Sequence, residues 1–181
     1  MNMKRVKMAR RAGRVSRYHT EFLVRPENVA EHTFNVLNLL VIMLDGGVSN
    51  NLLINALYHD GGEYVSGDIP SPVKRQVPGM KEAINKIEAI GTDSTIGYLP
   101  PITQWEHMML KVADNLDGML KCIEERAMGN YTIAEEYADR VGGVGGRYCA
   151  YLEAMLPDLG GGQAAELVQA AITEWHWGEK K

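Results

Sequence analysis

A histidine and an aspartate, His59 and Asp60, stand side by side at the end of an apolar helical run over residues 52–57. Adjacent residues on a helix point about 100° apart, so such a pair does not normally share a target. A metal ion near a helix end is one target that both can reach, through an imidazole nitrogen and a carboxylate oxygen. If the helix continues, Glu63 lies on the same side as the pair and can hold a metal-bound water. Alone, the pair is also typical of surface or capping residues, so a metal centre needs further ligands from elsewhere in the chain.

Two further residues complete a candidate metal set. His32 lies in the first turn of a predicted helix, and Asp114 lies in the middle of a long apolar one. A buried carboxylate needs a cation or strong donors, and Lys111, three residues before Asp114, is the alternative partner to a metal. With His59 and Asp60, the set comes from three helices. Imidazole and carboxylate ligands without sulfur suit Zn, Mn, Co, Ni or Fe, and they leave positions open for water or substrate.

Helical periodicity extends through the chain, and no β-alternation of useful length or internal repeat interrupts it. We expect helices over residues 3–15, 28–44, 50–66, 80–90, 103–128 and 163–177, and one that opens at residue 132. Glycines loosen the third helix at residues 61–62, end the fourth at residue 91 and interrupt the region around residues 142–146. Prolines make residues 68–74 a rigid loop. The sequence therefore predicts an all-α single domain of about seven helices over residues 1–181.

Composition excludes several classes of protein. The net charge of −4 gives no overall basic field for nucleic acid, although basic residues gather over residues 4–17, as a solvated helix face or as a funnel for anionic substrate. The two cysteines, Cys122 and Cys149, form no CxxC motif, which excludes a cysteine zinc site or disulfide framework. The longest apolar run is too short to span a bilayer, and no signal peptide is visible. We expect a cytoplasmic protein with neither a membrane nor a nucleic acid polymer as partner.

Three histidines fall outside the candidate metal set: His19, His107 and His176. We interpret all three as structural or surface residues. The C-terminal Trp-His-Trp stretch at residues 175–177 is interpreted as a packing or subunit contact.

The order His…His-Asp…Asp resembles the signature of the HD-domain metal-dependent phosphohydrolases. Other stretches resemble the YfbR-type 5'-deoxynucleotidases and the related phage dATP triphosphohydrolases (DatZ-like) within that family. They are residues 17–18, 27–32, 58–63, 67–74 and 111–114. The Gly-Asp-x-Pro-Ser-Pro-x-Lys piece at residues 67–74 is the most specific, because a general HD protein does not need it. The resemblance covers about residues 15–128 and leaves residues 129–181 for packing or oligomer contacts.

The resemblance implies a metal centre with two acidic residues beside it. The matching metal ligands are His32, His59, Asp60 and Asp114, and the implied cofactor is a divalent ion such as Zn, Co, Mn or Mg. Glu63 matches the acidic residue that positions the attacking water, and Asp68 matches a second acid beside the sugar and scissile phosphate. Such a metal lowers the pKa of a bound water towards about 7, and a base in the position of Glu63 contributes roughly 10²–10⁴-fold to the rate.

The resemblance also implies substrate-binding residues. Arg17 matches a phosphate-binding arginine, whose planar and always-charged fork suits phosphate oxygens. Lys74 and Lys111 match positions that approach the phosphate tail in the phage enzymes. Tyr18 stands where tryptophan is usual, which keeps an aromatic wall near the sugar or base but leaves base specificity open. The rigid proline loop can hold the Ser71 hydroxyl, together with the second acid, against the sugar.

The expected function is hydrolysis of a 5'-deoxynucleotide at the phosphorus next to the sugar, which leaves a deoxynucleoside. The substrate is dATP, with release of triphosphate, or a deoxynucleoside monophosphate, with release of phosphate. A strict monophosphate 5'-deoxynucleotidase and a non-catalytic nucleotide-binding HD module are the alternatives. An HD oxygenase should need a second pair of histidines, and the chain has only five histidines. The resemblance further implies a homo-oligomer, a dimer or higher.

Overall fold

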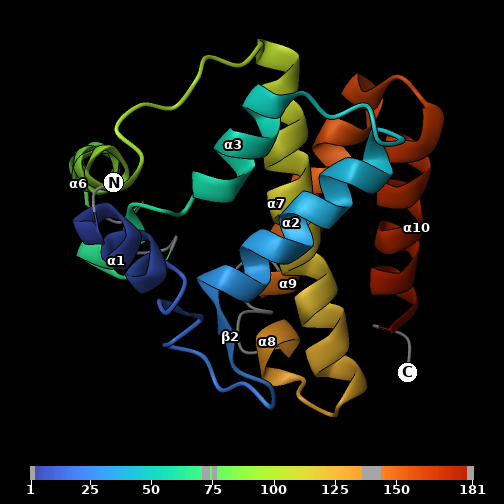
Figure 1. The fold of residues 1–181 in the computed structure, drawn as a ribbon. Helices are drawn as coiled ribbons and strands as arrows, with labels where there is room; N and C mark the ends of the chain where they lie inside the picture. Colours follow the sequence, from blue (N-terminus) through green and yellow to red (C-terminus); the bar gives the residue numbers. More distant parts are fainter. Residues whose placement is uncertain (1–2, 71–73, 75–76, 136–143, 179–181) are drawn as a thin grey trace. The chain divides into compact units, whose positions relative to one another are not determined.

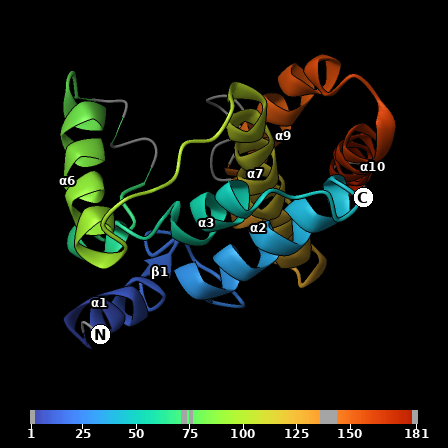
Figure 2. The same ribbon diagram turned by 45° about the horizontal axis from the view of Figure 1, so that its top comes forward.

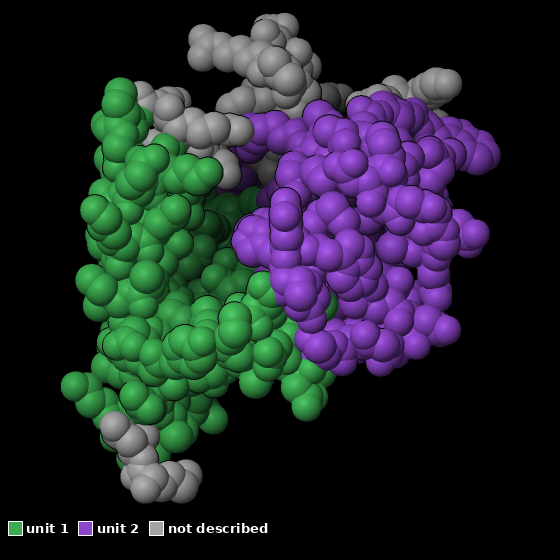
Figure 3. Space-filling model, turned by 90° about the horizontal axis from the view of Figure 1, so that it is seen from above, with its two compact units in different colours: residues 1–20, 26–34, 50–102 green, residues 21–25, 35–49, 103–181 purple. Residues whose placement is uncertain are grey.

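The computed structural model describes residues 3–70, 74, 77–135 and 144–178, and these are mostly helical (Figure 1). Seven of their α-helices are nine residues or longer, and their only sheet is one pair of two-residue strands. The all-α prediction is therefore confirmed. The chain forms two compact units, which Figure 3 colours separately. The prediction of one domain over residues 1–181 stays a prediction.

The first unit consists of Met1–Thr20, Pro26–Phe34 and Asn50–Ile102. Its elements are α1 (Met3–Ala12), β1 (Ser16–Arg17), β2 (Glu27–Asn28), the start of α2 (Val29–Met43), α3 (Asn50–Tyr58), α4 (Glu63–Ser66) and α6 (Met80–Thr95). Both α1 and α4 pack against α6 and against each other. This packing positions Glu63, a candidate catalytic residue, because Glu63 is the first residue of α4.

The two strands were not expected, because two residues are too short to show alternation. They pair antiparallel, with Ser16 opposite Asn28 and Arg17 opposite Glu27. The side chain of Asn28 accepts a hydrogen bond from the backbone N–H of Glu31 at 3.0 Å, so the predicted cap of α2 is confirmed. The strand pair therefore leads directly into α2 and fixes the backbone on both sides of Arg17.

The helix that was expected to continue through His59 and Asp60 ends at Tyr58 instead. Residues 59–62 form a turn, and Gly67 ends α4 as predicted. Within this turn Gly62 packs directly against the backbone of α6. A Cβ on Gly62 would lie 2.0 Å from the backbone oxygen of Glu88 on α6. The pair therefore stands at a break between two helices, where consecutive side chains can aim at one point.

Gly91 does not end α6, as the sequence had suggested, since the helix continues to Thr95. A Cβ on Gly91 would lie 2.6 Å from the backbone oxygen of Gly62. The absence of a side chain at Gly91 thus permits the close approach of two elements, and it does not break the helix.

The second unit consists of Glu21–Arg25, Asn35–Ser49 and Thr103–Lys181. Its elements are the rest of α2, α7 (Gln104–Ala127), α8 (Thr132–Glu135), α9 (Val144–Met155), the 3-10 helix η2 (Leu156–Leu159) and α10 (Gly162–Gly178). Figures 1 and 2 show α9 and α10 beside α7, which they contact. Thr103 and Glu106 cap α7 reciprocally, as a capping box. Of the glycines expected to interrupt this region, Gly145 and Gly146 lie in the first turn of α9, and residues 142–143 lie outside the described chain.

A buried polar cluster ties the segment Glu21–Arg25 to α7. The carboxylate of Glu125 accepts hydrogen bonds from the backbone N–H groups of Val24 and Arg25, at 2.7 and 2.9 Å. Lys121 donates to the same carboxylate at 3.0 Å, and Asn130 donates at 2.7 Å. Burial alone would raise the pKa of Glu125, but these donors outweigh it and lower the pKa to about 2.

None of the helices in the described ranges is both long enough and apolar enough to cross a membrane.

Candidate metal centre

Two tilted imidazole rings approach each other through their Nε2 atoms in the first unit. His32, in the first turn of α2, is fully buried, and His59 follows the end of α3. The Nδ1 of His59 lies 2.7 Å from the carbonyl oxygen of Ala56. A carbonyl oxygen can only accept, so Nδ1 carries the proton and Nε2 presents its lone pair. The two Nε2 atoms lie 3.1 Å apart.

The carboxylate of Asp60 meets both rings. Its Oδ2 lies 3.6 Å from the Nε2 of His32 and 3.5 Å from the Nε2 of His59. Nitrogen or oxygen ligands bound to one zinc-sized ion stand roughly 3 to 3.5 Å apart. The structure thus brings together three of the four predicted ligands with spacings that fit one divalent ion.

Arg17 lies beside this cluster and is itself held by a carboxylate. Its Nε lies 3.2 Å from the Oε2 of Glu27, the residue opposite it in the strand pair, and its Nη1 lies 3.8 Å from the Oδ2 of Asp60. Both Arg17 and Glu27 are buried. Glu27 neutralises the guanidinium and fixes its direction, which is how a buried ion pair orients a charged group.

Tyr18 and Asp68 lie next to Arg17. The backbone N–H of Tyr18 donates to the Oδ2 of Asp68 at 3.2 Å. The tyrosine ring centre lies 5.2 Å from the guanidinium carbon of Arg17, within cation–π distance. Tyr18 has a φ of 52°, a left-handed conformation that costs energy for a residue with a side chain. The three residues therefore form one connected wall at the centre.

Glu63 opens α4 and is buried. Its pKa is raised to about 9: burial contributes most, the charges of Asp60 and Asp68 add to the rise, and those of Lys74 and Arg17 oppose it. Among the described residues, no group forms a hydrogen bond with the buried Oε2 of Glu63. An unsatisfied buried oxygen is costly, so this carboxyl group is suited to a cation or to a water held by one.

A cavity of about 410 Å³ opens beside Glu63 and Asp68. Its lining also includes His19, which the sequence had left as a structural or surface residue. The volume suits a small ligand. Of the predicted substrate residues, Ser71 lies outside the described residues. Lys74 is described, and its Nζ lies 3.2 Å from the Oε1 of Glu88.

Asp114 and Lys111 belong to the second unit, where they form an ion pair on α7 at 3.1 Å. This is the alternative partner that the sequence suggested for Asp114. Their membership of the centre stays a prediction.

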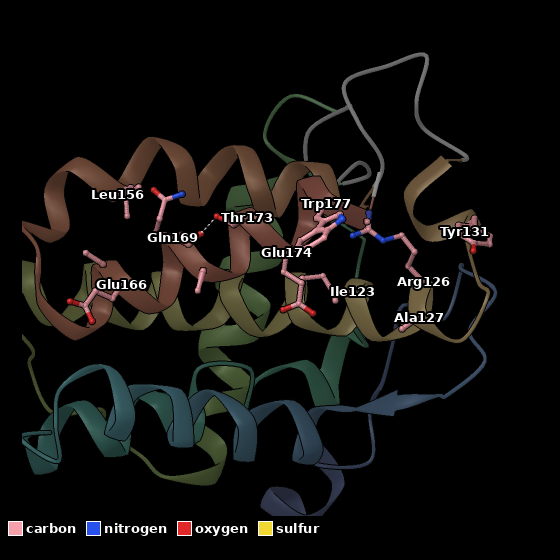
Figure 4. A pocket seen from close by; sticks show the side chains of 13 residues that line it. Ile123, Arg126, Ala127, Tyr131, Leu156, Glu166, Gln169, Thr173, Glu174 and Trp177 are labelled. Carbon is pink, nitrogen blue, oxygen red and sulfur yellow. Dashed lines mark hydrogen bonds between the residues drawn. The ribbon is translucent and has the colours of Figure 1, made fainter. Parts of the chain in front are cut away.

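A larger cavity, of about 1140 Å³, lies in the second unit (Figure 4). Side chains of α7 and α10 line it, among them Arg126, Gln169 and Trp177. None of the predicted site residues lines this cavity, so its size alone does not make it the catalytic pocket.

A sequence profile described as 5'-deoxynucleotidase YfbR-like matches residues 5–142, which is most of the chain. The chain belongs to the YfbR-like family. Among curated members, it is 35% identical over 130 residues to a 5'-deoxynucleotidase of Photorhabdus laumondii, covering 60% of this chain and 66% of that one. It is 32% identical over 133 residues to a 5'-deoxynucleotidase of Vibrio parahaemolyticus, covering 61% and 69%. The match spans about two thirds of the length of these YfbR-like relatives.

Solved structures share the fold of this YfbR-like chain. One is the HD phosphohydrolase DatZ of cyanophage S-2L, bound to dA and one catalytic Zn²⁺ ion, with a TM-score of 0.56 and 20% identity over 100% of this chain and 98% of DatZ. Another is the PH0347 protein of Pyrococcus horikoshii, with a TM-score of 0.61 and 18% identity over 99% and 100% of the two chains. These likenesses show the fold alone.

Glu27 is the site residue for which sequence analysis proposed no role. It lies inside the stretch 27–32 that carried the family resemblance, but its pairing with Arg17 depends on a two-residue strand. The one signal that pointed to Glu27 was indirect: if Arg17 is buried, it requires a carboxylate partner somewhere in the chain.

Proposed function

We propose that this chain is a metal-dependent phosphohydrolase that cleaves a 5'-deoxynucleotide at the phosphorus next to the sugar. The observation that carries the proposal is the convergence of the His32 and His59 Nε2 atoms with the Oδ2 of Asp60, beside a buried arginine and a buried glutamate. Membership of the YfbR-like family supports the choice of substrate.

His32, His59 and Asp60 would hold one divalent ion through two nitrogens and one oxygen. When bound, such an ion neutralises charge on a phosphoryl group and lowers the pKa of a water. The hydrogen bond from His59 to a backbone carbonyl fixes the ring so that Nε2 faces the ion. Transition metals such as Zn, Co or Mn suit this ligand set better than Mg does, because imidazole is a poor ligand for Mg.

Arg17 and Glu63 would act on either side of the phosphorus. Arg17 presents its guanidinium edge to the phosphate oxygens, and Glu27 keeps that edge in place. Glu63 accepts the proton of the attacking water, since its Oε2 is buried and has no hydrogen-bond partner among the described residues. Only the ionised form of Glu63 can accept this proton, and because its pKa is raised, that form becomes more abundant as the pH rises towards 9.

Asp68 and Tyr18 would contact the sugar side of the substrate. Asp68 lines the small cavity and binds the backbone N–H of Tyr18, so the two residues move together. We propose that tight packing at the sugar C2' gives a preference for the deoxy form. Comparable turnover of AMP and dAMP would contradict this preference.

We further propose that Asp114 supplies a fourth ligand, as the family resemblance implies. Asp114→Asn should then lower the metal content of the purified chain. A variant that retains one tightly bound ion would instead support the ion pair with Lys111 as the role of Asp114.

A monophosphate is the better supported substrate. Curated relatives in the YfbR-like family are named 5'-deoxynucleotidases. Lys74 and Lys111, the lysines predicted to reach a longer tail, each form an ion pair with a neighbouring carboxylate. A triphosphate would have to compete for these lysines, so dATP is the second candidate.

Product analysis by chromatography tests the proposal, with dAMP and dATP in parallel and Co, Mn or Mg supplied. Deoxyadenosine from dAMP alone establishes a monophosphate nucleotidase. Deoxyadenosine with intact triphosphate from dATP establishes the second candidate. If the wild type cleaves neither nucleotide but binds both, the chain is a non-catalytic nucleotide-binding module, and the proposal is wrong.

A further inference from the structure

A second group of metal-ligating side chains lies within the second unit. Cys149 and Glu153 stand four residues apart on α9, so their side chains leave the same face of that helix. His176 lies in the last turn of α10, which packs against α9 (Figures 1 and 2). Two neighbouring helices thus supply one sulfur, one nitrogen and one oxygen donor.

The three donor atoms converge. The Sγ of Cys149 lies 3.7 Å from the Nε2 of His176, and the same nitrogen lies 2.9 Å from the Oε1 of Glu153. One donor atom from each residue lies within 4.8 Å of the other two. Sulfur and nitrogen ligands at their usual zinc distances stand about 3.6 Å apart at two corners of a tetrahedron. The Sγ–Nε2 distance therefore already matches one edge of a zinc site.

The geometry differs from that of a nucleophilic Cys–His–Glu triad. In a triad the acid holds one ring nitrogen and the nucleophile faces the other. Here the thiol of Cys149 and the carboxylate of Glu153 both face the Nε2 of His176. Cys149 is only 3% exposed, which denies its sulfur to an external substrate. Donors gathered around one point suit a cation better than a relay of protons.

A surface ion pair between Glu153 and His176 also leaves part of the arrangement unexplained. Both side chains are about half exposed, and exposed pairs of this kind contribute little to stability. Such a pair gives no reason for a buried thiol to face the same nitrogen. The carboxyl end of α10 adds partial negative charge near His176, which favours a cation there. The exposed side of the group gives an ion access and leaves room for a water ligand.

We propose that Cys149, Glu153 and His176 form a second metal site, which takes Zn²⁺ with water as the fourth ligand. On binding, the thiol of Cys149 releases its proton to solvent, and a sulfur–metal bond replaces the S–H bond. The ion ties the last turn of α10 to α9. The sequence excluded a cysteine zinc site because two cysteines without a CxxC motif cannot supply several thiolates; the proposed site departs from that expectation, since it needs only one thiolate and takes its other donors from His176 and Glu153.

Titration of the intact chain with Co²⁺, followed by absorption spectroscopy, tests this proposal. A sulfur-to-cobalt charge-transfer band in the near ultraviolet requires a thiolate ligand. The candidate centre at His32 and His59 has nitrogen and oxygen donors, so it contributes no such band whether or not it is catalytic. We expect a band whose final intensity corresponds to one thiolate-bound Co²⁺ per chain, reached after no more than two equivalents because the first centre can also take Co²⁺, and which disappears when Zn²⁺ is added.

Substitutions assign the band to its ligands. Cys149→Ala should abolish it, and His176→Ala should weaken Co²⁺ binding at this site at least about tenfold. Cys122→Ala is the matched control, because Cys122 is the other buried cysteine and lies on α7; it should keep the band.

Absence of the band in the wild type would overturn the proposal, and so would a band that persists in Cys149→Ala. Circular dichroism checks the fold of each variant. If Cys149→Ala does not fold, His176→Ala decides in its place, because its side chain is half exposed and its loss is tolerated more easily. An unchanged titration in His176→Ala would exclude the site.

Discussion

The carboxyl group of Glu63 is buried next to two other carboxylates, those of Asp60 and Asp68. Burial contributes most to its raised pKa, and the like charges add to it. A group in this environment holds a proton more strongly than an ordinary glutamate does. With a pKa of about 9 it is mostly protonated at neutral pH, so the fraction that can act as a base grows as the pH rises.

Replacement of Glu63 tests that role most directly. Glu63→Gln preserves the volume of the side chain but removes the proton acceptor, so we expect kcat to fall by roughly 10²–10⁴-fold. Metal content should stay unchanged, because the nitrogen and oxygen donors of the centre remain. Phosphate release and elemental analysis measure the two quantities. Wild-type turnover in Glu63→Gln would remove this residue from the mechanism.

The pH dependence of activity should follow the neighbours of Glu63. Activity that requires an ionised Glu63 rises with pH through its pKa. Asp68→Asn removes a negative charge, so the pKa falls and the rising limb moves to lower pH. Lys74→Gln removes a positive charge, and the limb moves to higher pH. The midpoint of kcat/KM against pH is the readout, since the maximum rate changes for other reasons. Shifts of the same sign in both variants would contradict the assignment.

Sequence reasoning selected His32, His59 and Asp60 as candidate ligands because histidine and aspartate at helix ends are few and chemically distinctive, and the structure brings their side chains together. Glu27 could not be assigned in this way. A glutamate that neutralises an arginine cannot be distinguished from a surface glutamate until the pairing of the strands is known. The missing information was tertiary, because the two residues that pair are ten positions apart.

At the scale of elements, the local capping signals were read correctly, and features set by tertiary contacts were not. The caps at Asn28 and Thr103 involve residues three positions apart, so the sequence contains them. The glycines at 160–162 have positive φ values and break the chain as expected. Gly91 was misread because its role is to let α6 approach Gly62, a contact that no local pattern reveals.

The contact between Gly62 and α6 yields a prediction for stability. A Cβ at Gly62 meets backbone atoms of Glu88, which cannot move aside as a flexible side chain would. We expect Gly62→Ala to lower the free energy of unfolding by about 1–3 kcal/mol. Urea denaturation measures the change. Because Glu63 follows directly, activity should fall as well.

Gly146→Ala is the matched control for this substitution. Gly146 lies in α9, and a Cβ there meets nothing within 4 Å. Alanine favours a helix over glycine by about 1 kcal/mol, so this variant should be as stable as the wild type or more stable. Equal losses in both variants would show that the contact with α6 is not the cause.

At the scale of the whole molecule, Glu125 links acid sensitivity to folding. Its pKa is about 2 in the folded chain, because its hydrogen-bond donors outweigh the effect of burial. Because the pKa in the folded chain lies below the ordinary value near 4.5, the ionised carboxylate stabilises the fold fully at pH values above 4.5. This stabilisation is lost as the pH falls towards 2. The difference corresponds to a contribution on the order of 3 kcal/mol at neutral pH.

Denaturation between pH 5 and pH 2 should therefore separate Glu125→Gln from the wild type. We expect the variant to be less stable at neutral pH but to lose less stability on acidification. Glu124→Gln, at an exposed position of the same helix, is the control and should keep the wild-type pH dependence. Parallel curves for Glu125→Gln and the wild type would exclude this carboxylate as the origin of the acid sensitivity.

The hydrogen bond that holds the backbone of Tyr18 has a consequence for how the substrate site can change during evolution. The backbone is held by an N–H group that donates to Asp68, and every amino acid except proline has that group. The ring can be exchanged for another aromatic residue while the anchor remains. If the ring lies against the substrate, as proposed above, a single substitution at this position changes the shape of the pocket and leaves the metal ligands and Glu63 in place. Position 18 is a natural starting point for directed evolution of substrate range.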